Sequence, residues 1–457
     1  MANIVKELAK KIGIDKSIAY SSGARIIGGF TGVASVFFIT TFLTGVEQGF
    51  FYTFGSLLAM QVFFELGLTS IMTQFAAHEA SCLQLTDDGH YSGDPFFVSR
   101  LASLVRFCIK WYAILALLVV SFLLIVGFLY FKRFGETQST DVEWRLPWII
   151  ISIATGIKLY EGPLTSILSG LGYVKEMSII TFGQQIIIPV FTWIGLAVGL
   201  KLYVVGLGYL VSVIVWLTFV IRQGLLRIII NLWNEKIENR VSYMKEIFPL
   251  QWRISLSWIS GYFIFNIFNI VLFVVEGAVV AGQMGMTLQA LNAIQTLSFS
   301  WIGTKVPLYS KLIALKDYVQ LDKLFKKTLR QMTSVCAVLL FLFLLFIFFL
   351  RITELKINGN VFADRFLDYI PLLLMIIPVY THQYVNSWAT YLRCHKKEPF
   401  LINSVVAGGL CMISTLGFGH LYGLYGVTIG YCIIQILMFP WGYYTYYSYK
   451  RKWHNGK

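Results

Sequence analysis

The chain has 457 residues, of which 57% are hydrophobic and only 13% are charged, and its mean hydropathy is +0.70. No soluble domain of this size needs so much apolar surface, so the composition excludes a soluble protein and predicts an all-α, polytopic membrane protein. The net charge of +14 would suit a nucleic-acid-binding surface, but membrane proteins also gather basic residues on their cytoplasmic side.

Twelve transmembrane helices are predicted in chain order, each near or above the roughly 20 apolar residues that cross a bilayer. With the N-terminus in the cytoplasm, 27 of the 37 Lys and Arg residues fall in cytoplasmic segments and 7 in external ones. This asymmetry predicts that both termini are cytoplasmic and explains the basic charge without nucleic acid as a partner. The spans lie near 18–44, 48–77, 101–131, 145–170, 176–200, 203–222, 248–275, 277–301, 328–350, 366–391, 399–420 and 424–447.

Several kinds of site are not expected. The first 17 residues mix lysines with acidic residues, and the apolar run after them is too long for a cleavable signal peptide. The six cysteines contain no CxxC pair, so we expect no disulfide and no metal site. There is no GxxxxGK[ST] sequence, and the pair His78–Glu79 lacks the second His of a zinc protease. We therefore expect no enzyme, no catalytic residues and no cofactor.

A charge pattern in the first span returns in the seventh. Arg25 lies 22 positions before Glu47, and Arg253 lies 23 positions before Glu276. This repeated charge pattern predicts that the chain consists of two similar halves. Each half has six spans, an even number, so the two halves have the same orientation in the membrane. The expected parts are an N-terminal six-helix lobe over 1–222, a cytoplasmic linker over 223–246 and a C-terminal six-helix lobe over 247–457.

Arg25 and Arg253 are candidate substrate-binding residues. A guanidinium is always charged and binds phosphate in bidentate fashion, so two of them at one cavity would attract a diphosphate or an acidic sugar. Arg253 is also close enough to the interface to reach lipid headgroups instead. Glu65, in the second span, is a candidate coupling-ion or proton site, because ions buried in hydrocarbon are usually functional. It could equally be the counter-ion of Arg25.

The fourth span carries Lys158 and Glu161, three positions apart on one helix face, with Gly156, Gly162 and Pro163 weakening the helix around them. Interrupted helices at matching positions of two repeats point to a transport site. Lys158 is therefore a candidate for substrate binding and Glu161 for coupling to H+ or Na+. An anionic substrate that binds Lys158 would release Glu161 and favour proton uptake. The alternative is a buried ion pair that holds two helices together.

The matching stretch of the tenth span, 222 positions later, is neutral. It lies beside Pro378 and offers Gln383 as a candidate substrate-binding residue and His382 as a candidate ion-coupling residue. His382 could equally be a hydrogen-bonded core histidine.

Three stretches carry a resemblance to a known family. LTGVEQGFFYTFGSLLAMQVFFELGL, GAVVAGQMGMTL and SWIGTKVPLYSKLIALKDYVQLDKLF resemble bacterial polysaccharide biosynthesis membrane proteins of the Wzx type. These are O-antigen and capsule repeat-unit flippases of the multidrug/oligosaccharidyl-lipid/polysaccharide exporter (MOP) superfamily. The resemblance runs from about residue 20 to the C-terminus.

The resemblance implies two six-helix lobes around a central cavity in the bacterial cytoplasmic membrane. It implies that an undecaprenyl-diphosphate-linked oligosaccharide moves from the cytoplasmic to the periplasmic leaflet by alternating access. Membrane lipids, a polysaccharide polymerase and a chain-length regulator are the expected partners. Arg25, Lys158 and Arg253 fit the cationic cavity residues of such proteins.

Three alternatives remain. A multidrug exporter of the same superfamily should favour carboxylates, whereas the in-span charges here include three cations. A major-facilitator sugar transporter would carry a basic loop after the second span, where HEASCLQLTDD stands. A polymerase or ligase of the same pathway would carry a large periplasmic loop, and the external loops predicted here are short.

Overall fold

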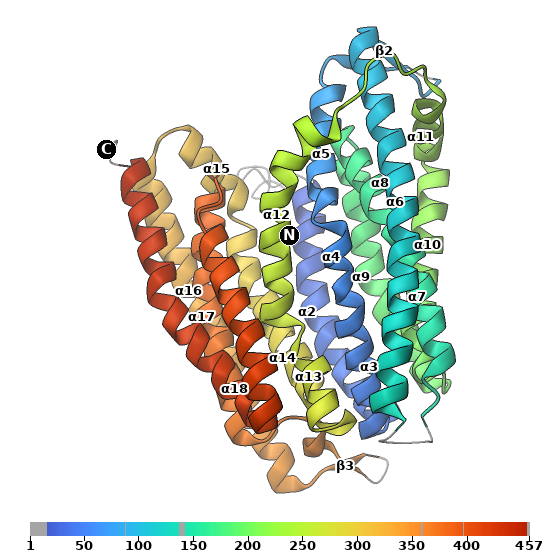
Figure 1. Ribbon diagram of the computed structural model, residues 1–457. Coiled ribbons are helices and arrows are strands. Elements are labelled where there is room, and N and C mark those ends of the chain that lie inside the picture. The colour runs from blue at the N-terminus through green and yellow to red at the C-terminus, as the bar shows by residue number, and fades with distance from the viewer. Residues whose placement is uncertain (1–15, 87, 137–141, 358–359, 396, 455–457) are drawn as a thin grey trace, which may run out of the picture. The chain divides into compact units, whose positions relative to one another are not determined.

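The computed structural model describes residues 16–86, 88–136, 142–357, 360–395 and 397–454, without the side chains of 16–22, 24–26, 70, 250 and 360. Helices dominate the described residues (Figure 1). The helices before residue 240 are α2 (Lys16–Phe42), α3 (Gly45–Leu58), η1 (Ala59–Gln61), α4 (Val62–Glu65), α5 (Leu68–Ala80), α6 (Pro95–Tyr130), η2 (Phe131–Gly135), α7 (Arg145–Leu159), α8 (Glu161–Gly170), α9 (Val174–Ala197), α10 (Tyr203–Arg222) and α11 (Leu225–Asn234).

The second part of the chain is also helical, and two short antiparallel hairpins lie in loops. The strands are β1 (Leu83–Leu85) with β2 (Tyr91–Gly93) and β3 (Lys356–Ile357) with β4 (Asn360–Val361). The helices after residue 240 are η3 (Tyr243–Ile247), α12 (Phe248–Phe265), α13 (Phe268–Val275), α14 (Ala278–Gly303), α15 (Val306–Ala314), α16 (Tyr318–Thr353), η4 (Phe362–Arg365), α17 (Tyr369–Arg393) and α18 (Leu401–His454).

The predicted helical, multi-span membrane protein is confirmed. Helix covers all or nearly all of every predicted span, and the last two spans form α18, which bends at Gly423. Within the described residues, six helical segments are long and apolar enough to cross a bilayer, and one of them, Gln251–Val275, consists of α12 and α13 in succession. Several other spans are built from shorter helices in succession, such as α7 with α8. The count of twelve, the parallel repeat and the cytoplasmic termini stay predictions.

The fourth span is interrupted where the sequence predicted. The helix stops at Leu159 and restarts at Glu161, and Pro163 cannot donate a backbone hydrogen bond to the turn before it. The matching interruption of the tenth span is absent, because α17 is continuous from Tyr369 to Arg393 with Pro378 inside it. A proline that lies within a membrane helix can be accommodated as a bend rather than as a break.

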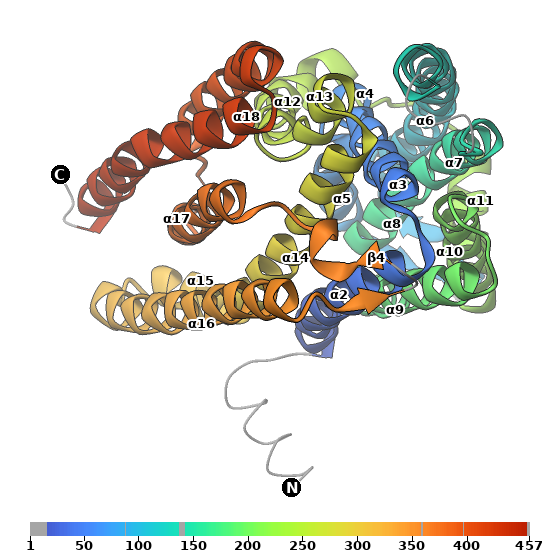
Figure 2. The same cartoon turned by 90° about the horizontal axis from the view of Figure 1, so that it is seen from below.

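The chain packs as two compact units. The first unit comprises residues 1–56 and 260–457, and the second comprises residues 57–259. The boundaries fall inside α3 and α12, so these units do not coincide with the predicted lobes. The reason is that α2 lies along α14 in the first unit (Figure 2). The lobe bounds therefore stay a prediction that rests on the repeat.

In the first unit, α3 and α14 approach so closely that their backbones touch. A Cβ atom added to Gly49 would lie 2.0 Å from the carbonyl oxygen of Ala278, which no side chain tolerates. Gly49 is therefore required at this crossing, because glycine lets two helices approach at backbone distance.

In the second unit, hydrogen bonds and ion pairs hold the linker after α11 against α6. The hydroxyl of Ser99 accepts hydrogen bonds from the backbone N–H groups of Glu238 and Asn239, both at 2.8 Å. The guanidinium of Arg100 binds both carboxylate oxygens of Glu79, at 3.0 and 2.9 Å, and one oxygen of Glu246 at 2.6 Å. One arginine thus joins the end of α5, the start of α6 and the end of the linker.

Candidate functional site

A cavity of about 420 Å³ lies within the first unit. Its walls come from α2, α3, α14 and the α12–α13 segment, and none of its 14 lining residues carries a charged side chain. Four carboxamides and three hydroxyls supply its polar surface. The carboxamides are Asn266, Asn269, Gln289 and Asn292, and the hydroxyls belong to Tyr52, Ser56 and Thr296. We call this the amide cavity.

A helix break brings two of the carboxamides to the amide cavity. α12 ends at Phe265 and α13 begins at Phe268, so Asn266 lies between two helices in the middle of an apolar segment. Asn269 follows one turn later in α13. On the other side, Gln289 and Asn292 lie three positions apart on one face of α14. Interrupted membrane helices that line a cavity are a common way to build a transport site.

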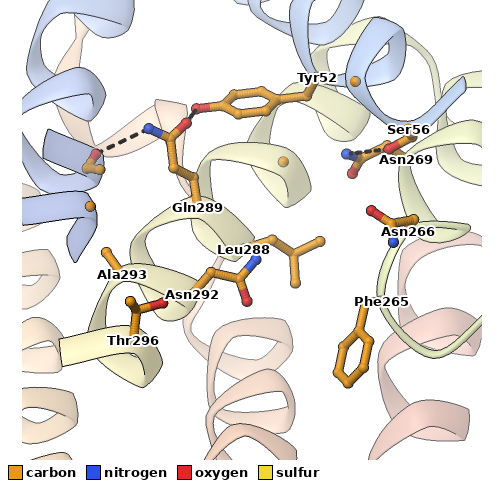
Figure 3. A pocket seen from close by; sticks show the side chains of 14 residues that line it. Tyr52, Ser56, Phe265, Asn266, Asn269, Leu288, Gln289, Asn292, Ala293 and Thr296 are labelled. Atoms are coloured by element: carbon orange, nitrogen blue, oxygen red, sulfur yellow. Dashed lines mark hydrogen bonds between the residues drawn. The ribbon is translucent and has the colours of Figure 1, made fainter. Parts of the chain in front are cut away.

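Hydrogen bonds hold some of the polar groups and leave others free. The Tyr52 hydroxyl donates to Gln289 Oε1 at 2.5 Å, and Gln289 Nε2 donates to the Gly32 carbonyl at 3.0 Å (Figure 3). Asn269 Nδ2 donates to Ser56 Oγ at 3.2 Å, whereas its buried Oδ1 has no partner among the described residues.

The remaining two carboxamides are available to a ligand. The side chains of Asn266 and Asn292 make no hydrogen bond within the described part of the chain, and Figure 3 shows them in the cavity with Asn269 and Gln289. A free carboxamide offers two N–H donors and one carbonyl acceptor. The amide cavity can therefore both donate to and accept from a neutral, hydroxyl-rich ligand.

A cluster of polar contacts lies in the first unit, about one helical turn from residues that line the cavity. Gln48 Nε2 donates to the carbonyl oxygens of Gly282, at 2.8 Å, and Arg365, at 3.1 Å. The buried Arg365 guanidinium donates through Nη2 to the Leu43 carbonyl at 2.7 Å. These residues lie at the α2–α3 turn, the start of α14 and the loop before α17, which the predicted topology places outside the cell.

Lys158 and Glu161 lie in the second unit, and their predicted direct pairing is wrong. Lys158 Nζ donates to Ser212 Oγ at 3.1 Å, while Gln184 Nε2 donates to Glu161 Oε1 at 2.8 Å and to Ser212 Oγ at 2.9 Å. The helix break at Tyr160 separates the two charges, so they do not share the face of one continuous helix. We call these four residues the polar relay.

One atom of the polar relay lacks a hydrogen-bond partner, and its cation also contacts an aromatic ring. Glu161 Oε2 is buried and has no hydrogen-bond partner among the described residues. Lys158 Nζ lies 5.0 Å from the ring centroid of Tyr209, which adds a cation–π contact.

The other predicted charges are spread through the chain. Glu65 ends α4 in the second unit and accepts from Thr69 Oγ1 at 2.7 Å. Arg253 also belongs to the second unit, and its exposed guanidinium lies 5.5 Å from the ring of Trp252, as the interfacial alternative expects. Arg25 lies in α2, and its side chain is outside the described residues.

The two candidates on α17 lie behind the amide cavity rather than in its lining. Gln383 is buried, and its Nε2 donates to the Gln295 carbonyl at 3.0 Å, while Gln295 Nε2 donates to the Val379 carbonyl at 3.4 Å. Gln383 therefore joins α14 to α17. The His382 ring packs edge-on against Phe265, 5.0 Å between centroids, and Phe265 lines the cavity.

The amide cavity is not among the predicted sites, because those predictions rest on charged residues and the cavity lining contains none. The signal was present in FIFNIFNIVLF and in LQALNAIQTL, where carboxamides three positions apart interrupt apolar helices. A carboxamide in hydrocarbon needs a partner. Paired carboxamides on one helix face are therefore informative even when they carry no charge.

Comparisons with known proteins identify the fold. No family model matches the chain, and no curated protein matches it in sequence. An inward-facing multidrug resistance MATE family transporter of the MOP superfamily matches with a TM-score of 0.59 at 14% identity, over 93% of this chain and 99% of that one. The lipid II flippase MurJ, in an inward closed conformation, matches with a TM-score of 0.56 at 14% identity, over 93% and 87% of the two chains.

A third structure agrees with these two. The Vibrio cholerae MATE transporter VcmN, in a mutant form, matches with a TM-score of 0.53 at 12% identity, over 98% of both chains. At such identities the similarity establishes the fold. The chain is thus a multi-pass membrane protein with the fold of the MOP superfamily transporters.

Proposed function

We propose that the chain is a flippase that moves an undecaprenyl-diphosphate-linked oligosaccharide repeat unit from the cytoplasmic to the periplasmic leaflet. The observation that carries this proposal is the chemistry of the amide cavity, which has four carboxamides and no charged side chain. Sugar hydroxyls both donate and accept hydrogen bonds, and carboxamides match them in both roles. The resemblance of the sequence to Wzx-type proteins supports the same substrate class.

The competing function is export of a cationic drug. A buried cation needs a carboxylate partner, because an unpaired charge in a low-dielectric site is costly. The amide cavity offers none among its lining residues. The two carboxylates proposed for ion coupling, Glu65 and Glu161, belong to the second unit.

The diphosphate requires a cation at the cavity, and Arg25 is the proposed one. Arg25 precedes Gly28 by three positions, a spacing that puts two residues on one helix face, and Gly28 lines the cavity. A guanidinium would bind the diphosphate in bidentate fashion. Lys158, Arg253 and Gln383 remain candidates for substrate binding.

The polar relay is the proposed site of ion coupling. Its free Glu161 Oε2 is an acceptor for a proton or a sodium ion, and Gln184 and Ser212 connect the other carboxylate oxygen, Oε1, to Lys158. Glu65 and His382 are the remaining candidates. We expect Glu161→Gln to preserve folding and substrate binding but to remove the response of transport to an imposed pH gradient in proteoliposomes. A wild-type response in this variant would make the relay a structural bridge.

The substrate class is tested by comparing the transport of two substrates. Proteoliposomes that contain the purified chain should translocate a fluorescent undecaprenyl-diphosphate oligosaccharide and should not accumulate a cationic dye. Empty liposomes serve as the control. Dye transport without oligosaccharide translocation would replace the proposal with the drug-export alternative.

A further inference from the structure

A second cavity, of about 640 Å³, lies within the first unit between α14 and α16, with one residue from α2. It is polar at one end and apolar along its floor. The floor consists of Phe30, Leu297, Val335 and Leu339, and the polar end of Ser300, Thr304, Lys305, Thr328 and Gln331, with Trp301 beside it. We call it the α14–α16 groove.

The groove is separate from the amide cavity. Gly285 to Thr296 of α14 line the amide cavity, whereas Leu297 to Lys305 line the groove, so the two sites share no residue and lie at successive stretches along the chain. The inference below therefore does not rest on the proposed function.

The polar end lies at the cytoplasmic end of the spans in the predicted topology. α16 begins at Tyr318 in a segment rich in lysine, and Lys305 follows directly after α14. Trp301, 41% exposed, lies one turn before Lys305, as expected for an aromatic residue at the headgroup level. The floor therefore extends from the headgroup level into the cytoplasmic leaflet.

The polar end offers one unpaired positive charge. The ammonium group of Lys305 makes no hydrogen bond or salt bridge within the described residues, and Lys305 is the charged residue that lines the groove. The hydroxyls of Ser300 and Thr328 are used as donors to carbonyls of their own helices, at 2.6 and 2.8 Å. The ligand must consequently bring the negative charge.

Helical spacing adds a second cation at the edge of the groove. Lys327 precedes Gln331 by one turn of α16, so these two residues share a face. Lys326 precedes the groove residue Thr328 by two positions, about 200° around the helix, and therefore lies on the opposite face.

The length of the apolar floor indicates which kind of lipid chain fits the groove. From Thr328 to Leu339 the groove follows α16 for about 16 Å at about 1.5 Å per residue. One leaflet of hydrocarbon is about 15 Å thick. An acyl chain that stays in one leaflet fits this length, whereas an undecaprenyl chain is longer than a leaflet.

We propose that the α14–α16 groove binds an anionic phospholipid of the cytoplasmic leaflet, with its phosphate at Lys305 and one acyl chain along Leu297, Val335 and Leu339. Basic pockets between helices on the cytoplasmic side attract anionic headgroups. The bound lipid would join α14, which also lines the amide cavity, to α16.

The test compares lipid binding to the full chain and to two single-lysine variants. Purified protein in detergent is mixed with phosphatidylglycerol and phosphatidylcholine of identical acyl chains, and native mass spectrometry measures the lipid retained. We expect wild-type protein to retain phosphatidylglycerol preferentially. Lys305→Gln should lower that retention about fivefold, since one lysine near the surface contributes about 1 kcal/mol. Lys326→Gln, the matched control, should behave as wild type.

A third variant tests the acyl-chain part of the site. Val335→Trp fills the floor and should lower phosphatidylglycerol retention while Lys305 is intact, with the unfolding midpoint confirming that the protein is folded. The proposal is overturned if wild-type protein retains the two lipids equally, which is the behaviour of unspecific annular lipid. It is also overturned if Lys305→Gln retains phosphatidylglycerol as wild type does, or if Lys326→Gln loses as much as Lys305→Gln.

Discussion

The amide cavity of the first unit and the polar relay of the second unit use polar groups in opposite ways. The relay contains two charged side chains, and both are engaged by neighbours: Lys158 by Ser212 and Tyr209, and Glu161 by Gln184. The amide cavity contains no charge, yet Asn266 and Asn292 have no partner within the described residues. The charged residues of the polar relay thus have most of their hydrogen bonds made by neighbouring side chains. The neutral carboxamides of the amide cavity have unused donors and acceptors, and this is the region that can bind a ligand.

The largest effect is expected in the amide cavity. Asn266→Leu combined with Asn292→Leu removes both free carboxamides, and each lost hydrogen bond to substrate is worth about 0.5–1.5 kcal/mol. Oligosaccharide translocation in proteoliposomes should fall about tenfold to a hundredfold, with the unfolding midpoint little changed. Asn231→Leu, in α11 of the second unit, is the control for the amide-to-leucine change. Unchanged translocation in the double variant would show that the cavity is not the substrate site.

Substitutions in the polar relay should lower the thermal stability of the protein. Lys158→Met removes the cation that Ser212 and Gln184 connect to Glu161, and removing one member of a buried charged network costs about 3–5 kcal/mol. Thermal unfolding in detergent should show a large loss for Lys158→Met and a smaller loss for Lys158→Met combined with Glu161→Gln. If the two substitutions are additive, the relay does not couple these residues.

A smaller effect is expected where α3 crosses α14. Gly49→Ala places a methyl group against the Ala278 carbonyl and should lower stability by about 1–3 kcal/mol, the usual range for overpacking. Gly261→Ala, where an added Cβ has nothing within 4 Å, is the matched control and should be neutral or slightly stabilising in thermal unfolding. Equal midpoints for the two variants would show that the crossing has room to separate.

The smallest effect concerns the linker of the second unit. Hydrogen bonding to Arg100 holds the pKa of Glu246 below its ordinary value. A carboxyl group with a lowered pKa in the folded state contributes stability above its unfolded pKa and loses it as the pH falls through the folded one. Because the Glu246 side chain is 32% exposed and screened by solvent, the contribution should stay below about 1 kcal/mol.

This contribution is measured as a pH dependence. Wild-type protein should lose a small part of its thermal stability as the pH falls below about 4.3, the ordinary pKa of a glutamate. Glu246→Gln should lack that part of the loss. Identical pH profiles would mean that the Arg100 contact to Glu246 adds nothing to the stability of the second unit.

The sequence by itself determined the class of the protein and where its helices lie. Apolar runs long enough to cross a bilayer set the spans, because a backbone in hydrocarbon must satisfy its hydrogen bonds within a helix. It also indicated a weakened helix around Lys158 and Glu161, where the break at Tyr160 lies, since Pro163 removes a donor from the preceding turn. These are local properties, which a linear pattern contains.

Only the tertiary structure decided which polar residues meet. Gln184 and Ser212 lie far along the chain from Lys158 and Glu161, and no spacing rule brings them between the two charges. The amide cavity likewise needs Asn266 and Asn269 from one helix break and Gln289 and Asn292 from the face of α14. Contacts between distant helices depend on how apolar faces pack against each other. The sequence pattern gives the face of each helix but not its partner.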